Sequence, residues 1–223
     1  MNRRSLLLGG TALVMAGGGW ALLQSGRGTG PDTGPLPGIA NAQEGGDALP
    51  VAEMTMGAED APVEMIEYAS FTCPHCATFH EEVWPRLKAD YIDTGKVRFI
   101  YREVYFDRPG LWASMIARCG GEARFFGITE ILYERQGEWA AGGDPAVIAA
   151  NLERIGKSAG LSDEDISACL SDGEMAEALV GWFRTNAEAD DITGTPSFVI
   201  DGEKVSNRSY DDLRALLDAK LEG

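Results

Sequence analysis

The sequence predicts an α/β protein in which a block of helices interrupts a mixed order of strands and helices. Two strand candidates flank a helical pattern between residues 63 and 104. No period-two alternation occurs from residue 111 to about residue 190, and strand character returns at residue 197. With 223 residues, 44% of them hydrophobic, the chain can form one ordinary domain with additions.

The first predicted unit is a strand, a helix and a second strand. Residues 63–68 are a short strand candidate, and residues 97–104 are rich in β-branched and aromatic side chains, which favour strands. Between them, residues 74–91 carry an apolar side chain at every fourth position, a spacing typical of a helix that packs one face on a sheet. Pro85 lies inside this helix, so we expect a kink there.

Several short helices are predicted for the middle of the chain, followed by a hairpin and a final amphipathic helix. Two of the helical patterns begin with an Asp or a Ser that is suited to cap a helix, and an Asp-Gly turn joins the strands of the hairpin. The helical patterns cover residues 111–119, 122–136, 145–159, 163–170 and 174–189, the hairpin strands cover 197–200 and 203–205, and the last helix covers 210–221.

The first 42 residues have the features of a targeting segment. Arg3 and Arg4 precede an uncharged stretch, residues 5–23, that is also long enough to span a bilayer. Residues 40–42 match a small-residue cleavage pattern, so a cleaved signal and a retained anchor both stay open. The paired arginines resemble a twin-arginine export signal, but they also suit an ordinary charged start.

These observations divide the chain into three parts. We interpret residues 1–42 as a signal peptide or membrane anchor with a Gly/Pro-rich linker, and residues 43–58 as linker with a possible first strand. Residues 59–223 form the folded domain, with its helical insertion at about residues 108–190.

The charge of the chain excludes one class of partner. The sequence has 35 acidic and 19 basic residues, a net charge of -16, and residues 43–223 alone carry -18. Such a body repels phosphates, so we expect no nucleic-acid binding. If the N-terminal segment is an export signal, the domain works in an oxidising space such as the periplasm, either free or tethered to the inner membrane.

The most informative motif is Cys73-Pro74-His75-Cys76, at the junction of the first strand and the first helix. Two cysteines three residues apart at a helix start lie on one face, close enough to form a disulfide. Pro74 suits the first helical position. The helix N-terminus favours the thiolate of Cys73, and His75 can stabilise it further. We therefore expect Cys73 to have a depressed pKa and to act as the nucleophile, with Cys76 as its resolving partner.

Two segments together resemble the DsbA family of thiol:disulfide oxidoreductases: Phe71-Thr72-Cys73-Pro74-His75-Cys76 and Gly194-Thr195-Pro196-Ser197-Phe198. The resemblance covers roughly residues 50–223. It implies a thioredoxin-like fold with an inserted all-helical subdomain, with Cys73 exposed, Cys76 resolving mixed disulfides and Pro196 a cis-proline that faces the pair. It also implies that the backbone of Thr195 holds substrate as an added extended strand.

The function that this resemblance implies is the donation of the Cys73–Cys76 disulfide to exported proteins that still have free cysteines. No cofactor is expected beyond this disulfide, and a membrane quinone-linked partner would reoxidise the pair. Many DsbA oxidases have an aliphatic residue where this chain has Thr195, which is similar to several isomerases and reductases, so the direction of reaction stays open. Against an isomerase, no separate dimerisation segment precedes the thioredoxin-like body, only a flexible linker of about twenty residues, and we expect a monomer.

Two further residues near the motif have both a functional and an ordinary interpretation. Glu67 lies in an otherwise apolar strand, where a buried carboxylate is costly. The resemblance offers a buried acid that relays protons near Cys76, whereas a partly exposed strand face would also explain Glu67. His80 lies four residues after Cys76 on the same helix face, and we favour a solvated side chain over one that tunes the thiols.

The other two cysteines, Cys119 and Cys169, both fall in the predicted helical block, 50 residues apart. A disulfide between them would contribute about 4 kcal/mol in the chain-entropy model. Two separate, buried, apolar side chains are the alternative, and export favours the disulfide.

A metal-binding module is the competing class of function. Cysteine and histidine residues cluster between Cys73 and His80, as in half of a zinc site. No second Cys-x-x-Cys motif exists to complete such a site, so we expect no metal.

Overall fold

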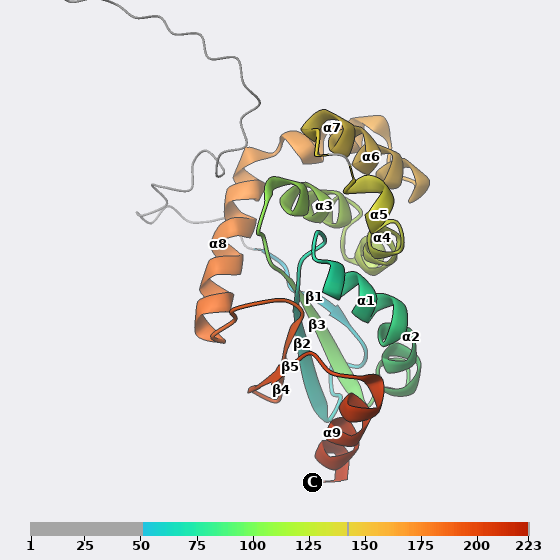
Figure 1. Ribbon diagram of the computed structural model, residues 1–223, viewed down its shortest axis with the longest axis vertical. Helices are drawn as coiled ribbons and strands as arrows, with labels where there is room; N and C mark the ends of the chain where they lie inside the picture. Colours follow the sequence, from blue (N-terminus) through green and yellow to red (C-terminus); the bar gives the residue numbers. More distant parts are fainter. Residues whose placement is uncertain (1–50, 142, 223) are drawn as a thin grey trace, which may run out of the picture. The chain divides into compact units, whose positions relative to one another are not determined.

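The computed structural model describes residues 51–141 and 143–222, and the predicted targeting segment lies outside them. Within this part of the chain, five strands form one mixed sheet in the order β1-β3-β2-β4-β5 (Figure 1). β2 and β3 are parallel, whereas the other neighbouring pairs are antiparallel. The strands are β1 (Met54–Met56), β2 (Val63–Ala69), β3 (Val97–Glu103), β4 (Ser197–Ile200) and β5 (Glu203–Ser206).

The α/β class and the predicted order of elements are therefore confirmed. A short strand, β1, also lies in the segment that we interpreted as linker with a possible first strand. Among the described residues, we find no helix that combines the length and the apolar character needed to cross a membrane.

Side chains of the central strand β2 alternate between the two faces of the sheet. Met65 packs in the main core, beneath α1 (Pro74–Glu82), α2 (Trp84–Leu87) and α9 (Tyr210–Glu222), which lie on one side of the sheet (Figure 1). Ile66 and Tyr68 point to the other face, where they pack with Phe183 of α8 (Gly173–Ala189). Because strand side chains alternate, Glu67 shares the face of Met65 and is buried under the first helix.

The helix predicted over residues 74–91 is divided into three parts. α1 ends at Glu82, α2 follows after Val83, and a π-helical turn continues from Lys88 to Ile92. Pro85 has no N–H to donate to the carbonyl of Glu81, and its ring crowds the preceding turn. The proline therefore interrupts the helix just before its own position, as well as bending the chain.

The helical block gathers at one end of the sheet, and α8 runs from it along the sheet toward β4 (Figure 1). The side chains of Asp107, Asp144 and Ser162 cap three of its helices by accepting backbone N–H bonds. The first helix of this block begins at Arg108, three residues earlier than predicted, because Asp107 caps it. The remaining bounds are α3 (Arg108–Cys119), α4 (Glu122–Glu134), α5 (Gln136–Trp139), α6 (Pro145–Ser158) and α7 (Asp163–Ser171).

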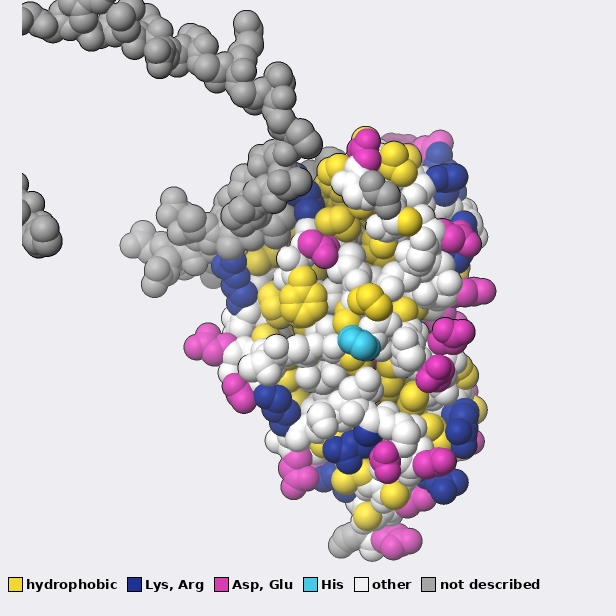
Figure 2. Space-filling model, in the orientation of Figure 1, with side chains coloured by type: hydrophobic (Ala, Val, Ile, Leu, Met, Phe, Trp, Pro, Cys, Tyr) yellow, Lys and Arg dark blue, Asp and Glu magenta, His cyan; other side chains and the backbone are white. Residues whose placement is uncertain are grey.

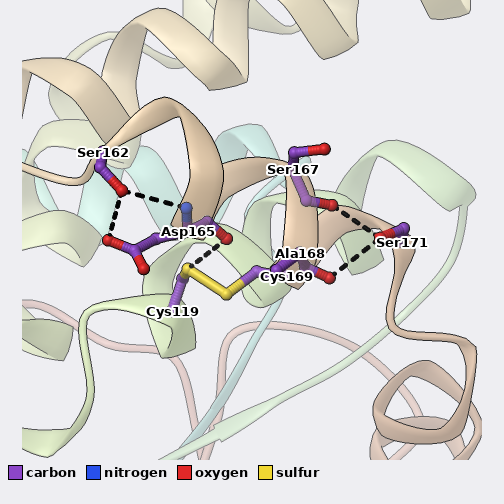
Figure 3. Close-up of a disulfide and its surroundings, with 7 residues drawn as sticks. All are labelled: Cys119, Ser162, Asp165, Ser167, Ala168, Cys169 and Ser171. Atoms are coloured by element: carbon purple, nitrogen blue, oxygen red, sulfur yellow. Dashed lines mark hydrogen bonds between the residues drawn. A yellow bond between two sulfur atoms is a disulfide. The ribbon is translucent and has the colours of Figure 1, made fainter.

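A disulfide joins two helices of this block. Cys119, the last residue of α3, is bonded to Cys169 of α7, and their Cα atoms are 5.9 Å apart (Figure 3). The bond closes a loop that contains α4, α5 and α6, so it ties the two ends of the helical block together.

Candidate active site

The Cys-Pro-His-Cys motif lies where β2 gives way to α1. After β2 ends, a short turn places Cys73 at the position that precedes the helix, and its N–H donates to the carbonyl of Ser70 at 3.0 Å. The carbonyl of Cys73 accepts from the N–H groups of Cys76 and Ala77 at 3.1 and 3.2 Å. This first helical turn brings both thiols to one face of α1. Cys73 is partly exposed, whereas Cys76 is completely buried.

The surroundings of the two thiols shift their pKa values in opposite directions. The Cys76 thiol donates to Cys73, and this hydrogen bond is the largest cause that lowers the pKa of Cys73 to about 5. The Thr195 side chain and the backbone N–H groups of Cys76 and His75 lower it further, against the effect of partial burial. Burial, the Cys73 thiol and the charge of Glu67 raise the pKa of Cys76 well above its ordinary value.

Thr195 and Pro196 lie against Cys73, in the loop that enters β4. The Thr195–Pro196 peptide bond is cis, and the Cys73 thiol donates to the carbonyl of Thr195 over 3.5 Å. The Thr195 hydroxyl is buried and has no other partner in the described part of the chain, so it is available to the Cys73 sulfur. Because β4 pairs with β2, the sheet itself holds this loop beside the start of α1.

Pro74 and His75 are exposed at the surface beside Cys73. Pro74 occupies the first turn of α1, as the sequence predicts. His75 favours the Cys73 thiolate through its backbone N–H, and the contribution of its imidazole stays a prediction. The face drawn in Figure 2 shows a histidine whose immediate neighbours are mostly apolar side chains and uncharged atoms, with charged side chains above it, below it and along the edges.

The prediction that His80 is solvated is wrong. The residue is only 8% exposed, and its Nε2 lies 3.2 and 3.1 Å from the two carboxylate oxygens of Glu67, which is itself fully buried. Its ring stacks on Tyr133 with centroids 4.1 Å apart. Residues 76 and 80 are one helical turn apart, so both face the sheet. The buried carboxylate gives the imidazole a partner inside the protein, which water would otherwise provide.

The structure adds supporting residues that the motifs do not reveal. Gln136, at the start of α5, donates through Nε2 to the carbonyls of Phe71 and Cys73 at 2.8 and 3.0 Å. The hydroxyl of Thr72 donates to the Asp107 carboxylate at 2.9 Å. These contacts join the helical block to the turn that carries Cys73. Gln136 follows the turn by more than sixty residues and belongs to no recognisable motif, so no local signal could identify it.

The cysteines and histidines between residues 73 and 80 do not converge on one point. His75 is exposed, whereas His80 is buried and directed to Glu67. Within residues 51–141 and 143–222, no three Cys, His, Asp or Glu side chains are arranged to hold a metal ion. The geometry of the pair instead suits thiol chemistry, with one reactive sulfur at the surface and one protected sulfur behind it.

Comparisons with known proteins agree with this arrangement. The family model described as thioredoxin matches residues 50–219. A putative protein-disulfide oxidoreductase of Rickettsia bellii is 33% identical over 171 residues, which cover 76% of this chain and 65% of the relative, so the match spans less than two thirds of that protein. Disulfide bond formation protein D of Bacillus subtilis is 25% identical over 180 residues, covering 75% of this chain and 77% of the relative.

Solved structures show the same relationship. The crystal structure of Wolbachia pipientis alpha-DsbA1 superposes with a TM-score of 0.70 at 26% identity. The aligned region covers 84% of this chain and 93% of the Wolbachia chain. BdbD from Bacillus subtilis in its oxidised form shares the fold, with a TM-score of 0.68 at 23% identity over 77% of this chain and 94% of that one. The chain therefore belongs to the thioredoxin family, and within that family it is of the DsbA type.

Proposed function

We propose that this protein is an extracytoplasmic thiol:disulfide oxidoreductase that introduces disulfides into exported proteins. The observation that carries the proposal is the asymmetry of the active pair: the pKa of Cys73 is lowered to about 5, while that of the buried Cys76 is raised. Stabilising the Cys73 thiolate stabilises the reduced protein relative to its disulfide form. The disulfide form is then a strong oxidant, which favours donation of the bond to other proteins.

The exchange proceeds in two thiolate attacks. A substrate thiolate attacks Sγ of Cys73, forms a mixed disulfide and breaks the Cys73–Cys76 bond, and Cys76 leaves with the electron pair. A second substrate thiolate then attacks the substrate sulfur of the mixed disulfide and releases Cys73 as a thiolate. The low pKa of Cys73 makes it a good leaving group. The substrate loses two electrons and gains a disulfide, and the enzyme becomes the dithiol.

The surface around Cys73 suits an extended, partly unfolded chain. The Thr195 carbonyl lies beside the Cys73 sulfur, at the start of β4, where a substrate segment can add as a short strand. We propose exported proteins with free cysteines as the substrate class for this reason.

The direction of reaction decides between this proposal and its alternative. An isomerase or reductase of the same fold would use the same cysteines, and the resemblance of Thr195 to such enzymes favours that alternative. An oxidase needs a partner that removes electrons from the reduced pair, for which we propose a membrane quinone-linked protein. We further propose that the protein acts as a monomer in the periplasm, exported or tethered through residues 1–42.

The redox equilibrium of the active pair tests the proposal. The protein is equilibrated with a series of glutathione buffers at fixed pH, acid-quenched, alkylated and analysed by mass spectrometry of the peptide that contains Cys73 and Cys76. We expect a potential closer to about −120 mV, the value of a strong oxidant, than to about −270 mV, the value of thioredoxin. A potential as reducing as that of thioredoxin would exclude the oxidase and favour the reductase.

A double variant, Cys119→Ser with Cys169→Ser, is the matched control. It leaves only the active pair to titrate, so an unchanged potential assigns the measured value to Cys73 and Cys76. Reactivation of a scrambled disulfide protein then separates the isomerase from the oxidase. An oxidase accelerates disulfide formation in a reduced substrate far more than it accelerates the reshuffling of wrong disulfides.

A further inference from the structure

The proposed reaction requires a proton to reach and to leave a buried sulfur. When the Cys73–Cys76 bond breaks, Cys76 departs as a thiolate in a site with 0% exposure. The raised pKa of Cys76 means that this thiolate takes up a proton at neutral pH. Reoxidation removes the same proton. Since no surface of Cys76 meets solvent, another buried group has to carry the proton.

Glu67 is the buried group best placed to exchange this proton. Its side chain is fully buried on the sheet face that α1 covers, and its charge acts on Cys76. Tyr101, opposite Glu67 on β3, and Tyr133 of α4 complete the cluster, and their hydroxyls are 2.6 Å apart. Burial raises the pKa values of both tyrosines, so they keep their own protons at neutral pH. The Glu67 carboxylate is the member of this cluster whose two oxygens both contact His80.

His80 connects Glu67 to the other side of α1. Its Nε2 contacts both carboxylate oxygens of Glu67, while its Nδ1 is buried and has no hydrogen-bond partner among residues 51–141 and 143–222. The same side chain lines a groove of about 760 Å³ between α1, α2 and α4, whereas Glu67 and Cys76 do not. An imidazole exchanges protons through two nitrogens, so it can accept on one side and release on the other.

We propose that His80 is a positioning residue that carries protons between the Glu67 carboxylate and water in this groove. The proposal rests on the proposed function, because the dithiol–disulfide cycle is what makes Cys76 gain and lose a proton. Nδ1 is covered in the structure, so a small movement of the groove wall has to admit water to it. The buried, unpaired nitrogen is the feature that an ordinary structural histidine would not need.

The proton balance closes over one catalytic cycle. On substrate attack, Nδ1 of His80 takes a proton from groove water, Nε2 gives one to Glu67, and Glu67 protonates the departing Cys76 thiolate. On reoxidation, Cys76 returns its proton to Glu67, forms the bond to Cys73 and displaces the partner sulfur with its electron pair. Nε2 of His80 then accepts the proton and Nδ1 releases one to the groove. The two half-reactions restore the original imidazole tautomer.

The charged groups around His80 favour entry of protons by this route. Four carboxylates and one lysine line the groove, which gives it a net negative charge that attracts cations. Lys88 is paired with Asp93 at 2.8 Å, so its charge is compensated. The titratable groups near His80 or along the groove are Cys76 and Glu81 of α1, Glu67 of β2, Tyr101 of β3, Glu130, Tyr133 and Glu134 of α4, Lys88 and Asp93.

Two substitutions of His80 separate proton transfer from packing. His80→Gln keeps a donor for Glu67 and fills the space but cannot carry a proton, whereas His80→Ala opens a cavity beside the groove. Each oxidised variant is mixed with excess glutathione, and the breaking of the Cys73–Cys76 bond is followed by stopped-flow tryptophan fluorescence. We expect both variants to react about a hundredfold more slowly, the low end of what a positioned proton carrier contributes.

Rescue and a matched control complete the test. Added imidazole should restore the rate of His80→Ala in a concentration-dependent way and should leave His80→Gln slow, because glutamine occupies the site. Glu82→Gln, an exposed change on the same helix, should react at the wild-type rate. Circular dichroism and thermal unfolding identify any variant that fails to fold, and His80→Gln then decides the question alone.

The outcomes distinguish this inference from the proposed function. Wild-type rates in folded His80→Gln would overturn the proton route, even if the wild-type potential is as oxidising as we expect. A reducing wild-type potential would instead overturn the oxidase, whatever the His80 variants do. Slow His80→Ala without imidazole rescue, combined with normal His80→Gln, would show that His80 only fills space.

Discussion

The two cysteine pairs of this protein show how position determines the chemistry of a thiol. Cys73 and Cys76 are three residues apart at the start of one helix and are free thiols in the structure. Cys119 and Cys169 are 50 residues apart on two helices and form a disulfide (Figure 3). The disulfide of the first pair can form and break within one helical turn. The disulfide of the second pair links α3 to α7, and its loss would remove that link.

The sulfur atoms also differ in the hydrogen-bond donors around them. The Cys76 thiol, the Thr195 side chain and backbone N–H groups donate to Cys73 and favour its thiolate. A carbonyl oxygen lies near each sulfur, that of Thr195 at 3.5 Å from Cys73 and that of Asp165 at 3.3 Å from Cys119 (Figure 3), so the donors make the difference. They prepare Cys73 for exchange, whereas the sulfur of Cys119 is held in a disulfide.

The largest expected effect comes from removing the reactive sulfur. Cys73→Ser should abolish thiol exchange, because Cys76 is buried and keeps its proton at neutral pH. Cys76→Ser should still attack a disulfide but then accumulate mixed disulfides, since no second thiol resolves them. Non-reducing electrophoresis and mass spectrometry with a cysteine-containing peptide measure both outcomes. Exchange that survives Cys73→Ser would show that the nucleophile is misassigned.

A smaller effect, on stability alone, is expected from the second pair. Replacing both Cys119 and Cys169 by serine should lower the free energy of unfolding by about 4 kcal/mol, because the unfolded chain loses the restriction of a 50-residue loop. Urea unfolding of the wild type and the double variant measures the difference. The rate of thiol exchange at Cys73 should be unchanged, and a large loss of exchange would mean that the two pairs are coupled.

The same comparison explains how much could be predicted from the sequence. The motif predicts the reactive pair because spacing, Pro74 and the strand–helix junction are all local features. The sequence separates Cys119 and Cys169 by 50 residues, so only their shared helical block and the expected export suggest a bond. The order of strands and helices follows from the periodicity of hydrophobic residues in the sequence, and the structure has the same order.

What the sequence could not predict depends on contacts between distant segments. His80 lies on an amphipathic helix that also has exposed charged positions, and only the position of Glu67 on the facing strand shows that the imidazole is buried. Gln136 reaches the Cys73 turn from a four-residue helix that no periodicity could reveal. Side chains that support a site across the fold carry no local pattern, even where the reactive residues do.

The smallest expected effect is the pH dependence of the active pair. Its free energy of reduction should change by about 1.4 kcal/mol per pH unit for each proton taken up. The folded pKa of Cys73 is about 5, below its ordinary value of 9.0, so thiolate stabilisation of the reduced form is present at high pH and is lost as pH falls through about 5. Cys76 keeps its proton throughout this range because its pKa is raised. From about pH 5 to about pH 9, reduction of the active pair therefore takes up one proton, and below about pH 5 it takes up two.

The potential of the Cys73–Cys76 pair should then change by about 30 mV per pH unit above pH 5 and by about 60 mV per unit below it. Glutathione or dithiothreitol buffers from pH 4 to pH 8 can measure this break. A dithiol that takes up two protons on reduction changes by about 60 mV per unit over the whole range and gives the reference slope. A slope of about 60 mV for the active pair at pH 7 would mean that Cys73 is a thiol there, and donor-stabilised thiolate chemistry would no longer distinguish the two pairs.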